Sequence, residues 1–250
     1  MESDIRVYPN LEALSRAAAE SLVELAAAAV AQTGCFSVAL SGGQTPRRLY
    51  QLLASDYRGR IVWPRVEVFW GDERYVPHDD PRSDYRMARE TLLAGVPLPR
   101  ENIHPMPTDP ADPEEAAQAY ERVLRAHFPS RPWPRFDLVL LGLGAEGHTA
   151  SLFPGSPALA EERRWVVAAE AEVAPPQRLT LTLPAINHGA HVHFLVAGEE
   201  KREALAQALA EPPDVARCPA SGVRPLDGEL VWWVDEAARG GPEAASKGTM

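Results

Sequence analysis

Residues 136–155, FDLVLLGLGAEGHTASLFPG, are the segment that decides the fold. The aliphatic run 138–141 has the length of a strand covered on both faces, which is typical of parallel sheets. Closely spaced glycines follow, among them Gly144 and Gly147, and glycine permits sharp turns and close approach to a ligand because it has no Cβ atom. Ligands of open α/β sheets bind at the carboxyl ends of the strands. We therefore predict that His148 lies in an active site.

Alternating strand and helix patterns around this segment predict an α/β fold with a mostly parallel, doubly wound sheet flanked by helices. Strands are expected at residues 36–40, 66–70, 138–141, 166–169, 179–183, 192–197 and 229–234. Helices are expected at residues 11–33, 46–53, 84–93, 113–127 and 199–209. We expect one domain over residues 1–239 and a disordered tail over residues 240–250, GGPEAASKGTM.

Composition narrows the classes of partner. The 250 residues carry a net charge of −10, which argues against nucleic acid or an anionic membrane as a general partner. Two cysteines, Cys35 and Cys218, cannot build a disulfide framework, and the first ten residues lack a signal-peptide pattern. No apolar run approaches the roughly 20 residues that span a bilayer. We expect a soluble cytoplasmic protein that is a monomer or a small homo-oligomer.

The strand at 36–40 runs into SGGQTP, residues 41–46, just before a predicted helix. Free N–H groups and the positive dipole end at a helix N-terminus bind anions, although Gly-Gly here is equally typical of a simple tight turn. The sequence matches neither the Walker A pattern nor the dinucleotide fingerprint. A serine hydrolase is a further alternative, but a nucleophile elbow needs Gly-x-Ser-x-Gly, and Ala39 replaces its first glycine before Ser41.

Two cations are predicted near other strand ends. Arg74 follows the strand at 66–70 together with Asp72, and a guanidinium held by carboxylates binds phosphate in two places. Lys201, the only lysine before residue 240, opens the predicted helix at 199–209, where the helix dipole disfavours a cation unless an anion is bound. The alternatives are a solvated charged loop for Arg74 and a solvent-facing side chain for Lys201.

The remaining histidines offer weaker candidates. His191 and His193 share one face of a predicted strand and would supply two metal ligands, but no third ligand is evident, so we predict no metal site. His78, Asp79 and Asp80 are acidic enough to attract a cation, but they lie in a proline-flanked loop, and we expect them to be exposed to solvent.

Six segments together resemble the 6-phosphogluconolactonase family, in order from about residue 38 to residue 238. They are SGGQTP (41–46), GDERYVP (71–77), SDYRMARETLL (83–93), GLGAEGHTASLFPG (142–155), RLTLTLPAIN (178–187) and WWVDEAA (232–238). The resemblance implies hydrolysis of 6-phosphoglucono-δ-lactone to 6-phosphogluconate, in the oxidative pentose phosphate pathway, without a cofactor. The sequence departs from the family pattern at Glu146, where an aspartate is usual, and the extra methylene can reposition the carboxylate.

With that substrate, His148 would be a general base for a water that attacks the lactone carbonyl. Backbone N–H groups at Gly144 and Gly147 would stabilise the oxyanion, and Asp72 would orient Arg74 or the imidazole. The predicted phosphate-binding set is Ser41, Gly42, Gly43, Thr45, Arg74 and Lys201.

Two alternatives to the lactonase remain open from the sequence. The wider superfamily includes glucosamine-6-phosphate deaminase, which has a similar glycine-histidine turn. A sugar-phosphate-sensing module would bind the same ligand without turnover, but it would normally carry a helix-turn-helix, and no basic recognition helix is evident.

Overall fold

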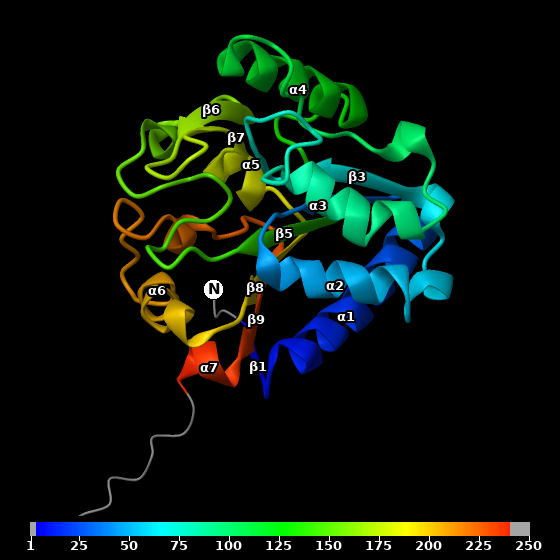
Figure 1. Cartoon of the computed structure of the whole chain (residues 1–250), viewed down its shortest axis with the longest axis horizontal. Coiled ribbons are helices and arrows are strands. Elements are labelled where there is room, and N and C mark those ends of the chain that lie inside the picture. Colours follow the sequence, from blue (N-terminus) through cyan, green and yellow to red (C-terminus); the bar gives the residue numbers. More distant parts are fainter. Residues whose placement is uncertain (1–3, 241–250) are drawn as a thin grey trace, which may run out of the picture.

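A computed structural model describes residues 4–240 of the chain (Figure 1). The predicted disordered tail therefore lies outside the described residues, except for Gly240. None of the described helices has the length and apolar character needed to cross a bilayer.

The centre of the fold is a six-stranded sheet in which every neighbouring pair is parallel. Its order is β1-β9-β8-β5-β2-β3, formed by β1 (Asp4–Tyr8), β9 (Glu229–Asp235), β8 (His191–Val196), β5 (Leu138–Gly142), β2 (Phe36–Leu40) and β3 (Val66–Trp70). Strands β2 and β5 are apolar and almost wholly buried, as expected when helices cover both faces. The predicted mostly parallel, doubly wound sheet is confirmed.

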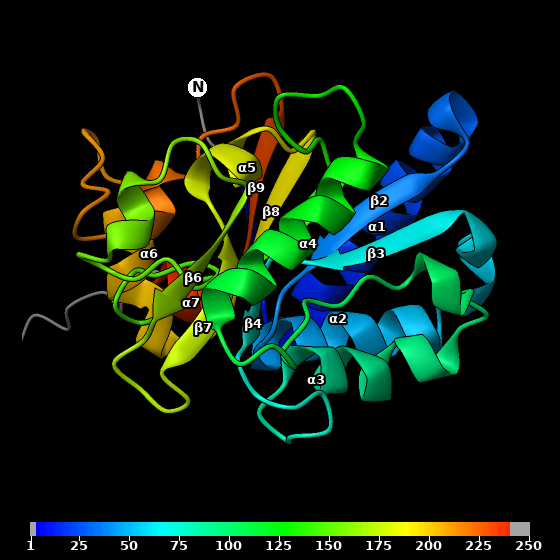
Figure 2. The same cartoon turned by 90° about the horizontal axis from the view of Figure 1, so that it is seen from above.

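Helices and a smaller sheet cover the two faces (Figures 1 and 2). One face carries α1 (Leu11–Thr33), α2 (Gln44–Ala54) and α3 (Asp84–Thr91); the other carries α4 (Pro113–His127) and α5 (Leu183–Asn187). Two further helices follow strands of the large sheet: α6 (Arg202–Ala208) comes after β8, and α7 (Glu236–Arg239) comes after β9. The predicted N-cap of α3 is confirmed, because the Ser83 side chain accepts a hydrogen bond from the Arg86 N–H.

A second, antiparallel sheet was not predicted. Its order is β4-β7-β6, formed by β4 (Asp72–Arg74), β7 (Gln177–Leu181) and β6 (Val166–Glu170). Strands β6 and β7 are joined by only a short turn, which permits an antiparallel hairpin but not the long crossover of a parallel pair. The strand expected at 179–183 ends at Leu181, because Thr182 caps α5 and Pro184 follows in its first turn.

The histidine pair on β8 is divided by burial. The ring of His193 packs edge-on against Trp233 at 5.5 Å, and burial lowers the pKa of His193 to about 3. His191 lies at the strand start and pairs with Glu229 at 3.3 Å. His193 is therefore a neutral core side chain.

Candidate active site

The carboxyl ends of four neighbouring strands, β8, β5, β2 and β3, surround a cavity of about 190 Å³. In the sheet, β2 lies between β3 and β5: the chain passes from β2 outward to β3 and then returns to β5 on the other side of β2. The cavity lies at this reversal of strand order, which is the usual ligand position in open α/β sheets. The predicted site residues that line it are Ser41, Gly42, Gly43, Thr45, Asp72, Arg74, Gly144, His148 and Lys201. Residues more than 150 positions apart in the chain thus meet as the sequence predicted.

The turn after β5 holds the imidazole of His148 in place. His148 Nδ1 lies 2.8 Å from Glu146 Oε1, and the ring packs on Phe153 with centroids 4.7 Å apart. Gly144 is required beside it, since a Cβ atom there would lie 2.0 Å from His148 Nδ1. A carboxylate only accepts hydrogen bonds, so Nδ1 carries a proton, and in the neutral imidazole the lone pair is then on Nε2.

Glu146 is ionised at neutral pH. Burial raises the pKa of Glu146, but its own backbone N–H, His148 and Lys201 lower it by more, and the net pKa lies below the ordinary value. Although glutamate is one methylene longer than the usual aspartate, its carboxylate contacts the imidazole at 2.8 Å.

The amides expected to form an oxyanion hole have other partners. The Gly144 N–H donates to the His148 carbonyl at 2.8 Å, and the Gly147 N–H donates to the Gly144 carbonyl at 3.0 Å. Gly147 has a φ of 88° and lies under the turn against Cys218 rather than on the cavity wall. The prediction that these two amides are oxyanion donors is wrong in this structure, because both groups are used to close the turn.

The loop between β2 and α2 has the form expected of an anion-binding loop. Gly43 caps α2 with a φ of 96°, a conformation that favours glycine, and Tyr50 anchors the backbone of Ser41 through its hydroxyl. Within residues 4–240, the N–H groups of Gly42 and Gly43 donate to no protein acceptor. They are free to meet an anion at the positive end of the α2 dipole.

Ser41 does not form a serine-hydrolase pair. Its hydroxyl is buried and has no hydrogen-bond partner among the described residues, so no histidine activates it.

Arg74 is held by a carboxylate that the sequence analysis did not select. Its guanidinium pairs with Asp84 Oδ1 at 2.9 Å and also donates to the Arg82 carbonyl. Asp84 is buried and packs against the loop so closely that a Cβ atom on Gly42 would lie 1.8 Å from it. Gly42 is thus needed for close approach of Asp84.

Asp72 has a different partner from either one predicted for it. Its Oδ2 accepts a hydrogen bond from the Ser151 hydroxyl at 2.7 Å, and the Ser151 N–H donates to the Thr180 hydroxyl on β7. Asp72 therefore links β4 to the turn that carries His148, and its orienting action on His148 would pass through that turn.

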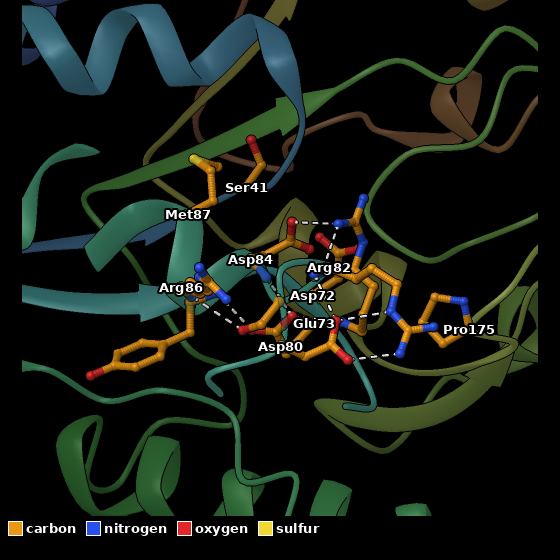
Figure 3. A network of polar contacts seen from close by, with 12 residues as sticks. Ser41, Asp72, Glu73, Asp80, Arg82, Asp84, Arg86, Met87 and Pro175 are labelled. Atoms are coloured by element: carbon orange, nitrogen blue, oxygen red, sulfur yellow. Dashed lines mark hydrogen bonds and ion pairs between the residues drawn. The ribbon is translucent and has the colours of Figure 1, made fainter. Parts of the chain in front are cut away.

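Figure 3 shows Asp72, Glu73 and Asp84 gathered in one polar network, and Asp84 is the member that pairs with Arg74. Glu73 is buried and accepts from the N–H groups of Arg74, Asp84 and Tyr85 and from the Ser83 hydroxyl. Burial raises the pKa of Glu73 despite these bonds. Burial, Asp72 and Glu73 raise the pKa of Asp84 well above its ordinary value, against the cation of Arg74. Glu73 and Asp84 are thus buried carboxyl groups whose pKa values are raised, and Asp84 has Arg74 as its ion-pair partner.

Lys201 lies at the far side of the cavity from Arg74 in the strand order. It ends a 3₁₀ turn, Glu199–Lys201, and caps α6, so the predicted helix at 199–209 is split into two segments. Within residues 4–240, no carboxylate lies within ion-pair distance of its ammonium group. The ammonium is available to a ligand.

A match to a family model over residues 9–232 settles the relationship of the chain. That model describes glucosamine-6-phosphate isomerases and 6-phosphogluconolactonase. The chain belongs to this family. The 6-phosphogluconolactonase of Synechocystis is 44% identical over 240 residues, which cover 95% of this chain and 98% of the relative. The 6-phosphogluconolactonase from Trypanosoma cruzi superposes with a TM-score of 0.85 at 31% identity, covering 95% and 96% of the two chains.

The other branch of the family shares the fold. A monomeric glucosamine-6-phosphate deaminase superposes with a TM-score of 0.77 at 20% identity. This likeness concerns the fold alone, whereas the lactonase relatives are also close in sequence.

Three residues of this family member's cavity region were missed from the sequence. Gln44 lines the cavity at the start of α2, Asp84 holds Arg74, and Ser151 holds Asp72. Asp84 and Ser151 lie inside segments that carried the family resemblance, but only their contacts with residues far away in the chain reveal what they do.

Proposed function

We propose that the protein hydrolyses 6-phosphoglucono-δ-lactone to 6-phosphogluconate as a step of the oxidative pentose phosphate pathway. The observation that carries the proposal is one cavity that combines an imidazole paired with a carboxylate and two cations beside an anion-binding loop. The names of the close relatives support the same activity.

The proposed chemistry begins with the Nε2 lone pair of His148. It removes a proton from a water molecule as the water oxygen attacks C1 of the lactone, and Glu146 stabilises the imidazolium that forms. The tetrahedral intermediate then collapses, the bond from C1 to the ring oxygen breaks, and the imidazolium gives its proton to that oxygen. The product is a carboxylic acid, which ionises at neutral pH, and the imidazole returns to its starting state.

The proposed phosphate site comprises the loop of Ser41, Gly42, Gly43 and Thr45 together with Arg74 and Lys201. The free amides of Gly42 and Gly43 and the two cations provide donors for a dianion. The amides of Gly144 and Gly147 close the turn, so they are not included among the proposed donors to the oxyanion at C1.

An assay with two substrates tests this function. Acid release from freshly prepared 6-phosphogluconolactone should greatly exceed the spontaneous opening of the lactone, while glucosamine 6-phosphate should release no ammonia. Ammonia release without lactone opening would favour the deaminase, and tight phosphosugar binding without either reaction would favour a sensing module.

Lys201→Met should raise KM for the phosphorylated lactone by about 10- to 100-fold, because a charge-assisted contact to phosphate is lost. Hydrolysis of the unphosphorylated glucono-δ-lactone should change little. Arg202→Met is the matched control, since Arg202 is the next residue but faces Glu199 at 3.3 Å and lies half exposed. Equal losses on both lactones would contradict a phosphate-binding role for Lys201.

Glu146→Ala should lower kcat by about 10- to 100-fold, because the imidazole loses the acceptor that fixes its tautomer. Glu146→Asp, which restores the usual family residue, should retain most of the activity, and the pH profile of kcat measured for both variants is the check. If Glu146→Ala kept both kcat and the profile of the unmodified protein, the contact to His148 would have no part in catalysis.

A further inference from the structure

A second cluster of ligating side chains lies outside the catalytic cavity. Glu67, His104 and His127 each offer a donor atom, and these atoms all lie within 4.8 Å of one another. Within residues 4–240 this is the one group of three or more such side chains with that spacing. None of the three lines the cavity that holds His148.

The backbone holds His104 rigidly between β3 and α4. Its N–H donates to the Val68 carbonyl at 2.9 Å, and its own carbonyl accepts from the Tyr120 hydroxyl at 3.1 Å. Tyr120 and His127 are seven residues apart on α4, so they lie on the same face of that helix. Both therefore approach His104 from one direction, and His127 does so from the last residue of the helix.

An aromatic side chain supports both imidazoles. Phe69 stacks on His104 at 4.6 Å and meets His127 edge-on at 4.8 Å, and the two imidazole centroids lie 6.0 Å apart. Glu67 projects from the same face of β3 as Phe69, because the two residues are two positions apart in a strand. Rings that are packed in place lose little freedom when they bind a ligand.

Two imidazoles and one carboxylate are a ligand set that suits Zn²⁺. In a tetrahedral site with bonds of about 2.1 Å, neighbouring donor atoms are about 3.4 Å apart. Glu67 Oε2 and His104 Nε2 are 2.8 Å apart, and the other donor pairs lie within 4.8 Å. Small χ rotations that move these donor atoms by about an ångström would therefore let all three bind one ion. The side chains of Glu67 and His104 are about one-fifth exposed, at 21% and 22%, which leaves room for water as a fourth ligand.

We propose that Glu67, His104 and His127 form a Zn²⁺-binding site, with water as the fourth ligand, that joins the C-terminal end of α4 to the edge strand β3. The site is separate from the proposed catalytic function. An ion that binds the folded chain but not the unfolded chain raises the free energy of unfolding, and this increase grows with the logarithm of the ion concentration. Zinc should therefore raise Tm without altering lactone hydrolysis.

Metal titration of the chelator-treated full chain tests the proposal. ZnCl₂ binding is measured by calorimetry and by Tm, and CoCl₂ is added for its visible absorption, which reports tetrahedral coordination. We expect one zinc ion per chain, and affinity at least about tenfold lower in His127→Gln and in Glu67→Gln. Glu67→Gln leaves the ring packing on Phe69 in place, so it remains informative if a histidine variant folds poorly.

His191→Gln is the matched control, because it removes a histidine from a pair with Glu229 that has no third ligand in the described part of the chain. It should bind zinc as the unmodified protein does. Equal zinc affinity in His127→Gln and the unmodified protein, or no binding by the latter at about 1 mM zinc, would overturn the proposal. Neither outcome bears on the lactonase assay, which is run with and without zinc on the same samples.

Discussion

Replacement of His148 by alanine should lower kcat/KM for 6-phosphogluconolactone by about 10²- to 10⁴-fold, the usual contribution of a general base. His148 has the one imidazole that lines the cavity in the described part of the chain, and Glu146 fixes its tautomer at 2.8 Å. Acid release is followed after subtraction of spontaneous hydrolysis. Affinity for the product 6-phosphogluconate should change far less than kcat, because the proposed phosphate site is untouched.

The control for this experiment is His191→Ala, which removes a histidine at the opposite end of the parallel strands. It should leave kcat/KM unchanged. A His148→Ala protein that kept kcat/KM within a few-fold of the unmodified protein would remove the imidazole from the mechanism.

Gly144→Ala should lower kcat/KM by about 10²-fold although it adds a single methyl group, because misplacement by about an ångström of a catalytic group has an effect of that size. The new Cβ atom would lie 2.0 Å from His148 Nδ1 and 2.8 Å from Glu146 Oε2, so the pair must move apart or leave its position. Steady-state kinetics and Tm are measured together.

Gly59→Ala is the matched substitution, since a Cβ atom there meets nothing within 4 Å. It should preserve both kcat/KM and Tm. Near-normal kinetics in Gly144→Ala would mean that the imidazole works from a position other than the one described.

The parallel sheet and the gathering of the site could be predicted because both depend on local signals. Apolar runs mark the strands at residues 36–40 and 66–70 at their observed bounds, and polar groups after such strands meet at one edge of a parallel sheet. Strand β1 was missed because it is a short edge strand with mixed burial, which lacks a clear pattern. Strand β4 consists of three charged residues and becomes a strand only by pairing with β7.

The missed parts of the site depend on contacts between distant residues. An aspartate at the start of α3 is expected simply from the helix dipole, and its ion pair with Arg74 becomes visible only when Gly42 is seen to make space for it. The glycines near His148 predicted a turn correctly, but sequence does not tell which N–H groups close that turn. The proposed oxyanion donors were wrong for this reason.

The passage of the chain from β3 into β4 has a consequence for how the protein tolerates change. Gly71 alone separates the two strands; its N–H donates to Leu40 of the large sheet, and its carbonyl accepts from Leu181 of the small one. Asp72 and Arg74 therefore belong to the small sheet, while the imidazole and the anion-binding loop follow strands of the large one. The candidate active site thus lies at the boundary between two sheets that Gly71 joins. We expect substitutions on the hairpin of β6 and β7 to alter substrate affinity without contacting the substrate.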